Sequence, residues 1–327
     1  MSADQKPKVL LFGVGSVGAV YLYLLSKVAS TTAVCRSNYD IVKANGFTIH
    51  SSIFGDNLHI QPNVVRSCDA AASQDTRPFD YILVCCKVIP GVPNLIKPAV
   101  TPGRTVIVLI QNGIGIEAEY ATAFPNNPIV TGAVYCKTTQ RPAGVVRHDE
   151  VELLELGSYP SSASNGHAEA FVKLIQSTGA TAELHDDVQT KRWYKLLVNA
   201  SWNPICALTM CTDVGFLQSS SLATTFVLDI MLEVCAIADA YGYTFQREEA
   251  EYQLARAVAR IERGNAVEPS MLQDVREGRR IEVEAIVGNA VRMGRERGVR
   301  CDKLECLYVL AKARDAQLGR DKADNLV

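Results

Sequence analysis

The chain has 327 residues, which corresponds to about two domains at ~150 residues each and is long enough to bury a large core. Hydrophobic residues make up 48% and charged residues 21%, which excludes a mainly disordered chain or a fibre. The net charge of -2 excludes a surface-wide field that attracts nucleic acid or anionic lipid, and no apolar run reaches the ~20 residues of a membrane span. Since the polar start from Met1 to Lys8 leaves no room for a signal peptide, we expect a cytoplasmic protein with no nucleic-acid or membrane partner.

Cysteine and histidine spacing argues against disulfides and metals. The 10 cysteines form no CxxC pair and several lie in apolar runs, so we interpret them as reduced core residues. The 5 histidines show neither the spacing of metal ligands nor an acidic cluster beside them. We therefore expect no metal site.

The first half of the chain alternates short apolar runs with helical patterns. The run from Lys8 to Phe12 ends at a glycine-rich turn, and a helical pattern follows it. Further buried strands are predicted over 32–35, 80–86, 105–110, 129–134 and 152–156, with a hairpin over 47–65 and a helix over 167–177. Strands joined through helices predict an α/β domain with a Rossmann-type, parallel, doubly wound sheet.

The second half contains few strand signals. Long periodic segments predict helices over 188–210, 222–241, 247–263 and 270–295, and the charged tail after Gly319 is expected to fray. We place the seam near Asp186 and Asp187, which gives a Rossmann domain over 1–187 and an all-helical domain over 188–327. An apolar patch in the helical half is either a homodimer face or ordinary core.

The glycine-rich turn reads Gly13-Val14-Gly15-Ser16-Val17-Gly18. After a strand and before a helix, this GxGxxG pattern is typical of dinucleotide binding. Gly13 would permit the tight turn, Gly15 would let a pyrophosphate approach the backbone, and Gly18 would let the helix pack on the strand. The amides at the helix N-terminus, including those of Ser16 and Val17, would donate to the phosphates. The alternative is a purely structural turn.

The end of the second strand indicates which dinucleotide binds. NAD sites usually carry Asp or Glu there, whereas this strand ends in Cys35-Arg36-Ser37-Asn38. Arg36 suits a 2′-phosphate, which favours NADPH or NADP+, unless it is an ordinary solvated residue. Lys87 and Asn112 each follow a predicted strand, at the sheet edge where open α/β sheets bind ligands, although Asn112-Gly113 is also a common turn pair.

A polar row is predicted on the first helix of the second half. Lys195, Asn199 and Asn203 recur every four residues and so share one helical face, among largely apolar neighbours. An amine directed into a cleft can donate to a ketone oxygen and serve in acid/base chemistry. The alternative is an exposed lysine with two structural asparagines near Pro204.

A carboxylate is predicted among small and apolar neighbours further along. If 270–295 is one helix, a single face carries Met271, Val275, Gly278, Glu282, Ala285 and Asn289. Glu282 then needs a partner, for which Lys195 is the candidate, unless Glu282 belongs to an exposed charged turn with Arg279 and Arg280. Ser270 either faces the cleft or belongs to a capping box with Gln273.

Together these motifs resemble the ketopantoate reductase family, the 2-dehydropantoate 2-reductases. The resemblance spans about residues 8 to 300 and rests on the glycine turn, Arg36, Lys87, Gln111-Asn112-Gly113, Lys195 to Asn199 with Asn203-Pro204, Ser270 to Asp274, and Glu282-Val283-Glu284. It implies an NADPH-dependent reduction of a small 2-keto acid in a cleft between a Rossmann domain and a helical domain.

The resemblance also implies a role for each matching residue. Lys195 would donate to the keto oxygen and protonate the alkoxide, and Glu282 would orient that group and hold the product hydroxyl. Asn112 would lie near both nicotinamide and substrate, and Lys87 near the cofactor. Asn199 and Asn203 would contact the pantoyl part, and Ser270 would bind the carboxylate.

Two positions depart from the better-known bacterial members. Asp213 stands where those carry a further substrate-contacting Asn, and Val287 stands in place of the Asn of a frequent Asn-Gly pair. A carboxylate at position 213 would repel an acid substrate or select a different one.

Three functions remain open. The first is reduction of 2-dehydropantoate to (R)-pantoate in pantothenate and coenzyme A biosynthesis. The second is reduction of another 2-keto acid by a D-2-hydroxyacid dehydrogenase-like enzyme. The third is an NADP(H)-binding sensor without turnover, which has no use for Lys195, Asn199 and Glu282 together.

Overall fold

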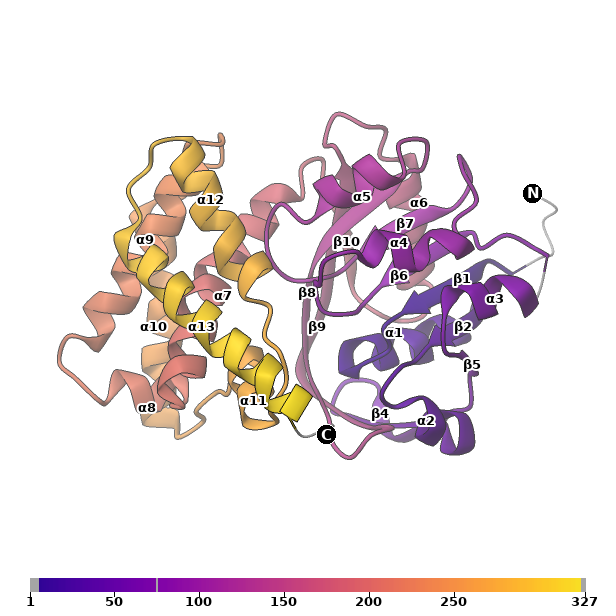
Figure 1. The fold of residues 1–327 in the computed structure, drawn as a ribbon, viewed down its shortest axis with the longest axis horizontal. Coiled ribbons are helices and arrows are strands. Elements are labelled where there is room, and N and C mark those ends of the chain that lie inside the picture. Colours follow the sequence, from indigo (N-terminus) through magenta and orange to yellow (C-terminus); the bar gives the residue numbers. More distant parts are fainter. Residues whose placement is uncertain (1–5, 75, 325–327) are drawn as a thin grey trace. The chain divides into compact units, whose positions relative to one another are not determined.

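The computed structural model describes residues 6–74 and 76–324, in two compact units. The first unit comprises the described residues up to Asn112 together with Ile116–Val188, and the second comprises Gly113–Gly115 and the described residues from Gln189 onward. A mixed α/β unit followed by a helical one confirms the predicted fold class (Figure 1). The inclusion of Gly113–Gly115 in the second unit was not predicted. Most of the predicted polar start, Met1 to Lys8, lies outside the described residues.

The first unit is built on one mixed sheet, so the predicted parallel arrangement holds for part of it only. Its described strands are β1 (Lys8–Phe12), β2 (Ser30–Val34), β3 (Phe47–Ser51), β4 (Gly55–Ile60), β5 (Asn63–Val65), β6 (Tyr81–Val84), β7 (Val106–Leu109), β8 (Ile129–Gln140), β9 (Val145–Tyr159) and β10 (Ala182–Leu184). Their order is β4-β3-β9-β8-β7-β6-β1-β2-β5, with β10 pairing parallel to β9. The run from β5 to β8 is parallel and β8 and β9 are antiparallel. β3 and β4 form a hairpin over 47–60, shorter than the predicted 47–65, because residues 63–65 pair with β2 as the parallel strand β5. The carboxyl ends of β1, β2, β6 and β7 therefore share one edge.

Helices cover both faces of the parallel strands. The helices of this unit are α1 (Ser16–Ser26), α2 (Tyr39–Asn45), α3 (Cys68–Gln74), α4 (Val92–Ile96), the short 3-10 helix η1 (Lys97–Ala99), α5 (Glu117–Ala123) and α6 (Gly166–Gln176). Neighbouring residues of a strand point to opposite faces, and Leu10, Leu11, Ile82 and Leu83 are all 0% exposed. The sheet is thus buried on both sides, as a doubly wound sheet requires.

The second unit is helical and packs around α7 (Gln189–Thr209). The other helices are α8 (Asp213–Leu217), α9 (Ala223–Asp239), α10 (Arg247–Arg263), α11 (Ser270–Arg276), the π-helical turn η2 (Glu284–Gly288), α12 (Asn289–Glu296) and α13 (Asp302–Asp324). Trp193, Leu197 and Ala200 of α7 lie in the core of this unit. Ile114, which belongs to the Gly113–Gly115 segment, is 1% exposed in the same core.

Two sequence predictions about this unit are wrong. The segment 270–295 is not one helix, because α11 ends at Arg276 and Gly278 adopts a left-handed φ of +61° before the chain resumes as η2 and α12. The predicted continuous face from Met271 to Asn289 therefore does not exist. The tail does not fray directly after Gly319, since α13 continues to Asp324.

The cysteines are free thiols, mostly shielded from solvent. All 10 are described and none forms a disulfide. Burial raises the pKa of Cys35, Cys68 and Cys206 to about 12, so these thiols stay protonated at neutral pH. Cys306 is exposed, which corrects the expectation that the cysteines are core residues.

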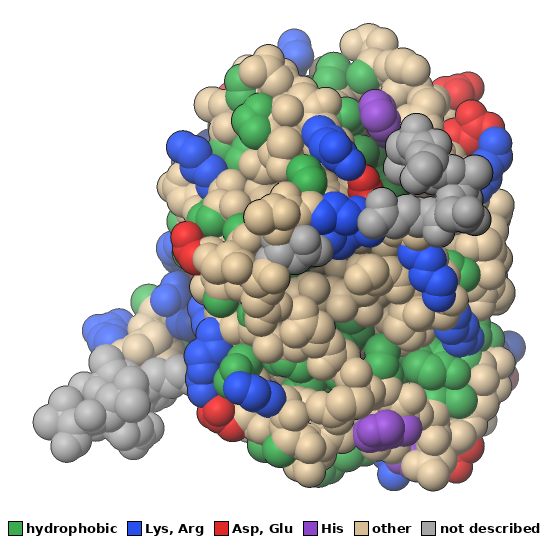
Figure 2. All heavy atoms as spheres, turned by 90° about the vertical axis from the view of Figure 1, so that its right-hand side faces the viewer, with side chains coloured by type: hydrophobic (Ala, Val, Ile, Leu, Met, Phe, Trp, Pro, Cys, Tyr) green, Lys and Arg blue, Asp and Glu red, His purple; other side chains and the backbone are tan. Residues whose placement is uncertain are grey.

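The visible surface mixes side chains of all kinds. On the face in Figure 2, Lys and Arg side chains are interspersed with hydrophobic and neutral ones.

No helix in the described part of the chain is both long and apolar enough to cross a membrane. In the second unit Leu222 is 72% and Val309 62% exposed, so these two side chains are not core, and light scattering will test whether they belong to a homodimer face.

Candidate functional site

The glycine turn between β1 and α1 makes its closest contacts at Gly13. The Gly13 and Val14 amides donate to the Val34 carbonyl at 3.2 and 3.3 Å, and the Gly13 φ is +81°. A Cβ atom at Gly13 would lie 2.2 Å from Cβ of Cys86, the second residue after β6. Only glycine fits a position that combines this φ with this close approach.

The other two glycines of the turn have different surroundings. A Cβ at Gly18 would lie 3.2 Å from Cβ of Cys85, so α1 packs closely on the end of β6. A Cβ at Gly15 would meet no atom within 4 Å, so the backbone there is open to an incoming group. The first intrahelical bond runs from the Ala19 amide to the Gly15 carbonyl at 3.0 Å, which leaves the amides of Ser16 and Val17 as first-turn donors. Open backbone beside such donors is suited to a phosphate group.

The end of β2 presents Arg36 and Ser37 to solvent, whereas Asn38 is buried. The side-chain Nδ2 of Asn38 donates to the Val14 carbonyl at 2.9 Å and to Gln140 Oε1 at 3.1 Å. Asn38 thus holds the glycine turn through the Val14 carbonyl. No sequence motif indicated this role. The exposed groups at this strand end are a guanidinium and a hydroxyl, which suit a phosphate monoester.

Lys87 and Asn112 are both half-buried and follow neighbouring strands, β6 and β7. The Gln111 side-chain amide donates to the Cys86 carbonyl at 3.0 Å and so ties the two strand ends together. Burial raises the pKa of Tyr120, so its hydroxyl stays protonated and donates to Gln111 Oε1 at 2.9 Å. The structure therefore places the residues next to Lys87 and Asn112 at one edge of the sheet.

The predicted polar row lies on a single helix, α7, in the second unit. Lys195 and Asn199 are half-buried and Asn203 is 4% exposed, so the exposed lysine of the alternative is wrong, whereas a structural asparagine is what Asn203 proves to be. Asn203 Oδ1 accepts from Ser270 Oγ at 3.1 Å and from the Met271 amide at 3.0 Å. The structure thus brings Asn203 and the exposed Ser270 together.

These bonds also explain how α11 begins. Pro269 precedes the helix and offers no side-chain cap, and Gln273 donates to the Glu268 carbonyl at 2.9 Å instead of completing a box with Ser270. The predicted capping box is therefore wrong. Asn203, from another helix, accepts the first-turn amide of Met271 in its place.

Glu282 lies in the connection between α11 and η2 and is 9% exposed. The neighbouring Arg279 pairs with Asp274 at 2.9 Å, and Arg280 Nε donates to Asp315 at 2.8 Å. Because Glu282 itself is buried, the alternative of an exposed charged turn is wrong for it. A buried carboxylate at this position is suited to accept a hydrogen bond from a ligand or to hold a proton.

Asp213 has partners within the second unit, contrary to our expectation that it acts on the substrate. It is 1% exposed, and its carboxylate pairs with Arg260 at 2.5 Å. It also accepts from the Val214 and Val267 amides at 2.8 and 2.7 Å. Because Arg260 balances the charge of this carboxylate and two amides occupy its oxygen, the pair as a whole presents no net charge to an acid substrate.

Two carboxylates lie beside His185, although the sequence predicted no acidic cluster next to a histidine. His185 Nε2 lies 3.4 Å from a Glu155 oxygen and 3.7 Å from a Glu183 oxygen. Glu155 stands opposite Glu183 in the β9–β10 register, and this pairing was not visible in the sequence. The expectation that no acidic cluster lies beside a histidine is therefore wrong. The expectation that the protein has no metal site stays a prediction.

The Gly113–Gly115 segment is held by two side chains that sequence reasoning also missed. Arg192 of α7 donates to the Gly113 carbonyl at 2.6 Å, and Asn289 of α12 donates to the Ile114 carbonyl at 2.6 Å. The Ile114 amide donates to the Ala285 carbonyl at 3.1 Å. No local sequence signal links residues so far apart in the chain.

Comparisons with known proteins agree with the two-part organisation. The family model described as ketopantoate reductase PanE/ApbA matches residues 9–161, and the one described as ketopantoate reductase PanE/ApbA C terminal matches residues 187–315. An uncharacterised protein of Saccharomyces cerevisiae is 29% identical, over 96% of this chain and 95% of its own length.

Two solved structures show the same fold. The crystal structure of 2-dehydropantoate 2-reductase from Methylococcus capsulatus is 32% identical, with a TM-score of 0.82 over 95% of this chain and 97% of its own. The ternary structure of D-mandelate dehydrogenase with NADH and anilino(oxo)acetate also has a TM-score of 0.82, at 19% identity, over 95% of this chain and 99% of its own.

Proposed function

The chain belongs to the ketopantoate reductase PanE/ApbA family of oxidoreductases, and from this premise we propose that it reduces a 2-keto acid with NADPH. The substrate we propose first is 2-dehydropantoate, which gives (R)-pantoate for pantothenate and coenzyme A biosynthesis. The observation that carries the proposal is the presence, in one chain, of an open glycine turn at Gly15 and a half-buried Lys195 in line with Asn199 and Asn203.

The residues of the first unit fit a dinucleotide. The open backbone at Gly15 and the first-turn amides of Ser16 and Val17 suit the pyrophosphate. We assign the 2′-phosphate to Arg36, which is exposed at the end of β2. Lys87 and Asn112, at the ends of β6 and β7, complete the cofactor-binding set. When bound, NADPH would supply the hydride.

The residues of the second unit fit a keto acid. Lys195 would donate to the keto oxygen and, as charge develops on that oxygen, transfer a proton to it. Glu282 would accept a hydrogen bond from the resulting hydroxyl. Asn199, Asn203 and Ser270 would hold the remainder of the substrate, with the exposed Ser270 hydroxyl at its carboxylate and Asn112 at both cofactor and substrate.

A second candidate keeps this chemistry and changes the substrate. The likeness to D-mandelate dehydrogenase, whose structure holds NADH and anilino(oxo)acetate, favours a bulkier or aromatic 2-keto acid. The test is NADPH oxidation, followed by absorbance, with 2-dehydropantoate, a panel of branched and aromatic 2-keto acids, and NADH as the control cofactor. Selective turnover of 2-dehydropantoate supports the first candidate, and turnover of the bulkier acids alone supports the second.

A non-catalytic NADP(H) sensor is the remaining alternative, and Lys195→Ala separates it from an enzyme. Loss of a general acid lowers turnover by ~100-fold or more, and NADPH affinity should stay unchanged because the glycine turn is intact. Lys173→Ala is the matched control, since Lys173 is an exposed partner of Glu169 on α6. Tight NADPH binding by a wild-type protein that turns over none of the acids would contradict the enzyme and leave the sensor.

A further inference from the structure

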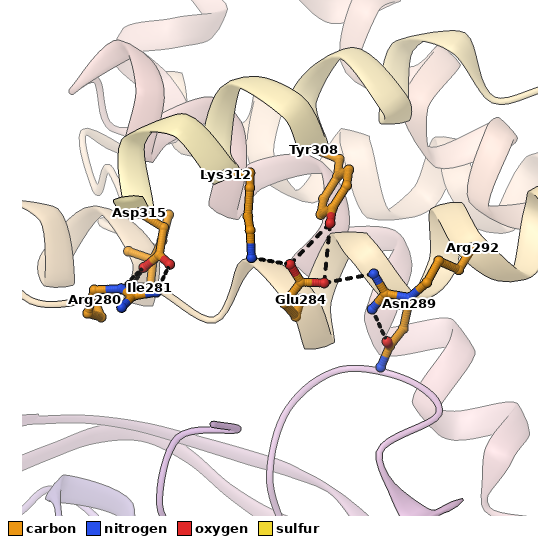
Figure 3. Close-up of polar contacts among 8 residues, drawn as sticks. All are labelled: Arg280, Ile281, Glu284, Asn289, Arg292, Tyr308, Lys312 and Asp315. Carbon is orange, nitrogen blue, oxygen red and sulfur yellow. Dashed lines mark hydrogen bonds and ion pairs between the residues drawn. The ribbon is translucent and has the colours of Figure 1, made fainter. Parts of the chain in front are cut away.

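The π-helical turn η2, which follows Glu282, is held to α13 through the side chain of Glu284. The Glu284 carboxylate accepts from Tyr308 Oη at 3.1 Å, Lys312 Nζ at 2.5 Å and Arg292 Nη1 at 2.7 Å (Figure 3). Tyr308 and Lys312 lie four residues apart on α13, so both reach Glu284 from one side of that helix. The Glu284 side chain is 36% exposed, and this amount of solvent contact leaves room to change it without emptying a core.

A second attachment lies on the other side of Glu282. Asp315 Oδ1, also on α13, accepts from the Ile281 amide at 2.9 Å and from Arg280 Nε at 2.8 Å (Figure 3). The Asp315 side chain is only 4% exposed. Glu282 therefore lies on a stretch of chain fixed to one helix at positions 281 and 284, which restricts the backbone from which its carboxylate projects.

The network continues from Glu284 toward the segment that follows Asn112. Arg292 donates to Glu284 through Nη1 and to Asn289 Oδ1 through Nη2 at 2.5 Å (Figure 3). Asn289 in turn donates to the Ile114 carbonyl at 2.6 Å. Ile114 belongs to the Gly113–Gly115 segment of the same unit, so the polar contacts of Glu284 extend to that segment.

Gly288 makes room for this network. A Cβ there would lie 2.7 Å from Glu284 Oε2 and 2.8 Å from Tyr308 Cε2. A single methyl group would therefore push the Glu284 carboxylate out of place without removing any donor or acceptor.

We propose that Glu284 is a positioning residue, which together with Asp315 holds Glu282 in the orientation that turnover requires. The inference rests on the proposed function. Displacing a reacting group by about 1 Å can lower the rate ~100-fold. Glu284→Gln keeps the shape of the side chain but weakens its hydrogen bonds to Tyr308, Lys312 and Arg292, so we expect kcat to fall by roughly 10-fold. NADPH affinity should change by less than about twofold, because no cofactor-binding residue is altered.

The test is a double-mutant cycle between Glu284→Gln and Glu282→Gln. If Glu284 acts through Glu282, the double variant should have the same kcat as Glu282→Gln alone, and the pH profile of kcat should shift in Glu284→Gln. Gly288→Ala, which retains every polar group, should reproduce the loss seen in Glu284→Gln.

Glu305→Gln is the matched control. It breaks the Arg295–Glu305 pair, which joins α12 to α13 and involves neither Glu284 nor Asp315. This variant should keep the wild-type kcat and lose at most as much thermal stability as Glu284→Gln.

The outcomes separate the two proposals. If the wild-type protein turns over a 2-keto acid, two results would overturn the positioning role and leave the reductase intact. One is kcat losses that multiply in the double variant, and the other is an equal loss of kcat in Glu305→Gln and Glu284→Gln. A wild-type protein without turnover of any 2-keto acid would overturn the proposed function and, with it, the inference.

Discussion

Replacing Gly13 by alanine tests whether the glycine turn is shaped by close packing. The new Cβ would lie 2.2 Å from Cβ and 2.7 Å from Cα of Cys86, while carbon atoms in contact stay about 3.5–4 Å apart. The β1–α1 turn and the end of β6 must therefore separate by roughly 1 Å or more. Overpacking of this kind costs about 1–3 kcal/mol. The φ of +81° adds about 1–2 kcal/mol for a residue with a side chain.

Together these costs predict a loss of about 2–5 kcal/mol, which lowers Tm by roughly 5–20 °C for a unit of this size. Gly15→Ala is the matched control in the same turn, since a Cβ there meets nothing within 4 Å and the φ is negative, at -87° with ψ -149°. It should lower Tm clearly less than Gly13→Ala and instead raise the Kd for NADPH by ~10-fold or more, because the methyl occupies the space proposed for the pyrophosphate.

The assays are thermal unfolding without ligand, followed by circular dichroism, and NADPH titration by fluorescence. An unchanged Tm in Gly13→Ala would refute the packing argument. An equal loss of Tm in both variants would refute the distinction between the two glycines.

Three further predictions concern charged residues. Arg36→Asp should lower kcat/KM for NADPH by ~100-fold relative to kcat/KM for NADH, because it replaces a partner of the 2′-phosphate by an acceptor for the ribose hydroxyls. If steady-state kinetics show the same ratio of the two kcat/KM values as in wild type, Arg36 does not bind the 2′-phosphate. Asp213→Asn should lower the free energy of unfolding, measured in urea, by about 1–3 kcal/mol and leave KM for the keto acid within twofold, whereas a clear fall in KM would return Asp213 to the substrate site. Burial would raise the pKa of Asp315, but hydrogen bonds from Arg280 and the Ile281 amide outweigh it and hold this pKa below its usual range. Asp315→Asn should therefore lower the free energy of unfolding by about 1–3 kcal/mol at pH 7. In urea titrations this difference from wild type should shrink as the pH falls below about 4 and through the folded-state pKa of Asp315. A difference independent of pH would contradict this account.

Local patterns predicted those parts of the fold that local physics determines. The glycine turn follows from the need for a positive φ at Gly13, and α7 from four-residue spacing in its sequence. The break after α11 could not be predicted in this way. The apolar spacing continues through Gly278, while the acceptor that holds Ile281 is Asp315, a residue on another helix.

The same limit applies to the candidate site. The residue types and spacings of Lys195, Asn199 and Asn203 were sufficient to place them on one helical face. That Asn203 accepts the amide of Met271, and that Asp213 pairs with Arg260, depends on contacts between segments distant in sequence. A polar residue in a motif was therefore identifiable, but its partner was not.

The contribution of Gly113–Gly115 to the helical unit bears on how this protein can be divided. Cutting the chain between Val188 and Gln189 would yield a C-terminal fragment that lacks Ile114, a residue only 1% exposed in that fragment's core. Loss of such a side chain costs about 2–5 kcal/mol, so the fragment should be much less stable than its helix content suggests. Chimaeras between relatives face the same constraint: a first half taken from one protein must bring a three-residue segment that fits the π-helical turn of the other.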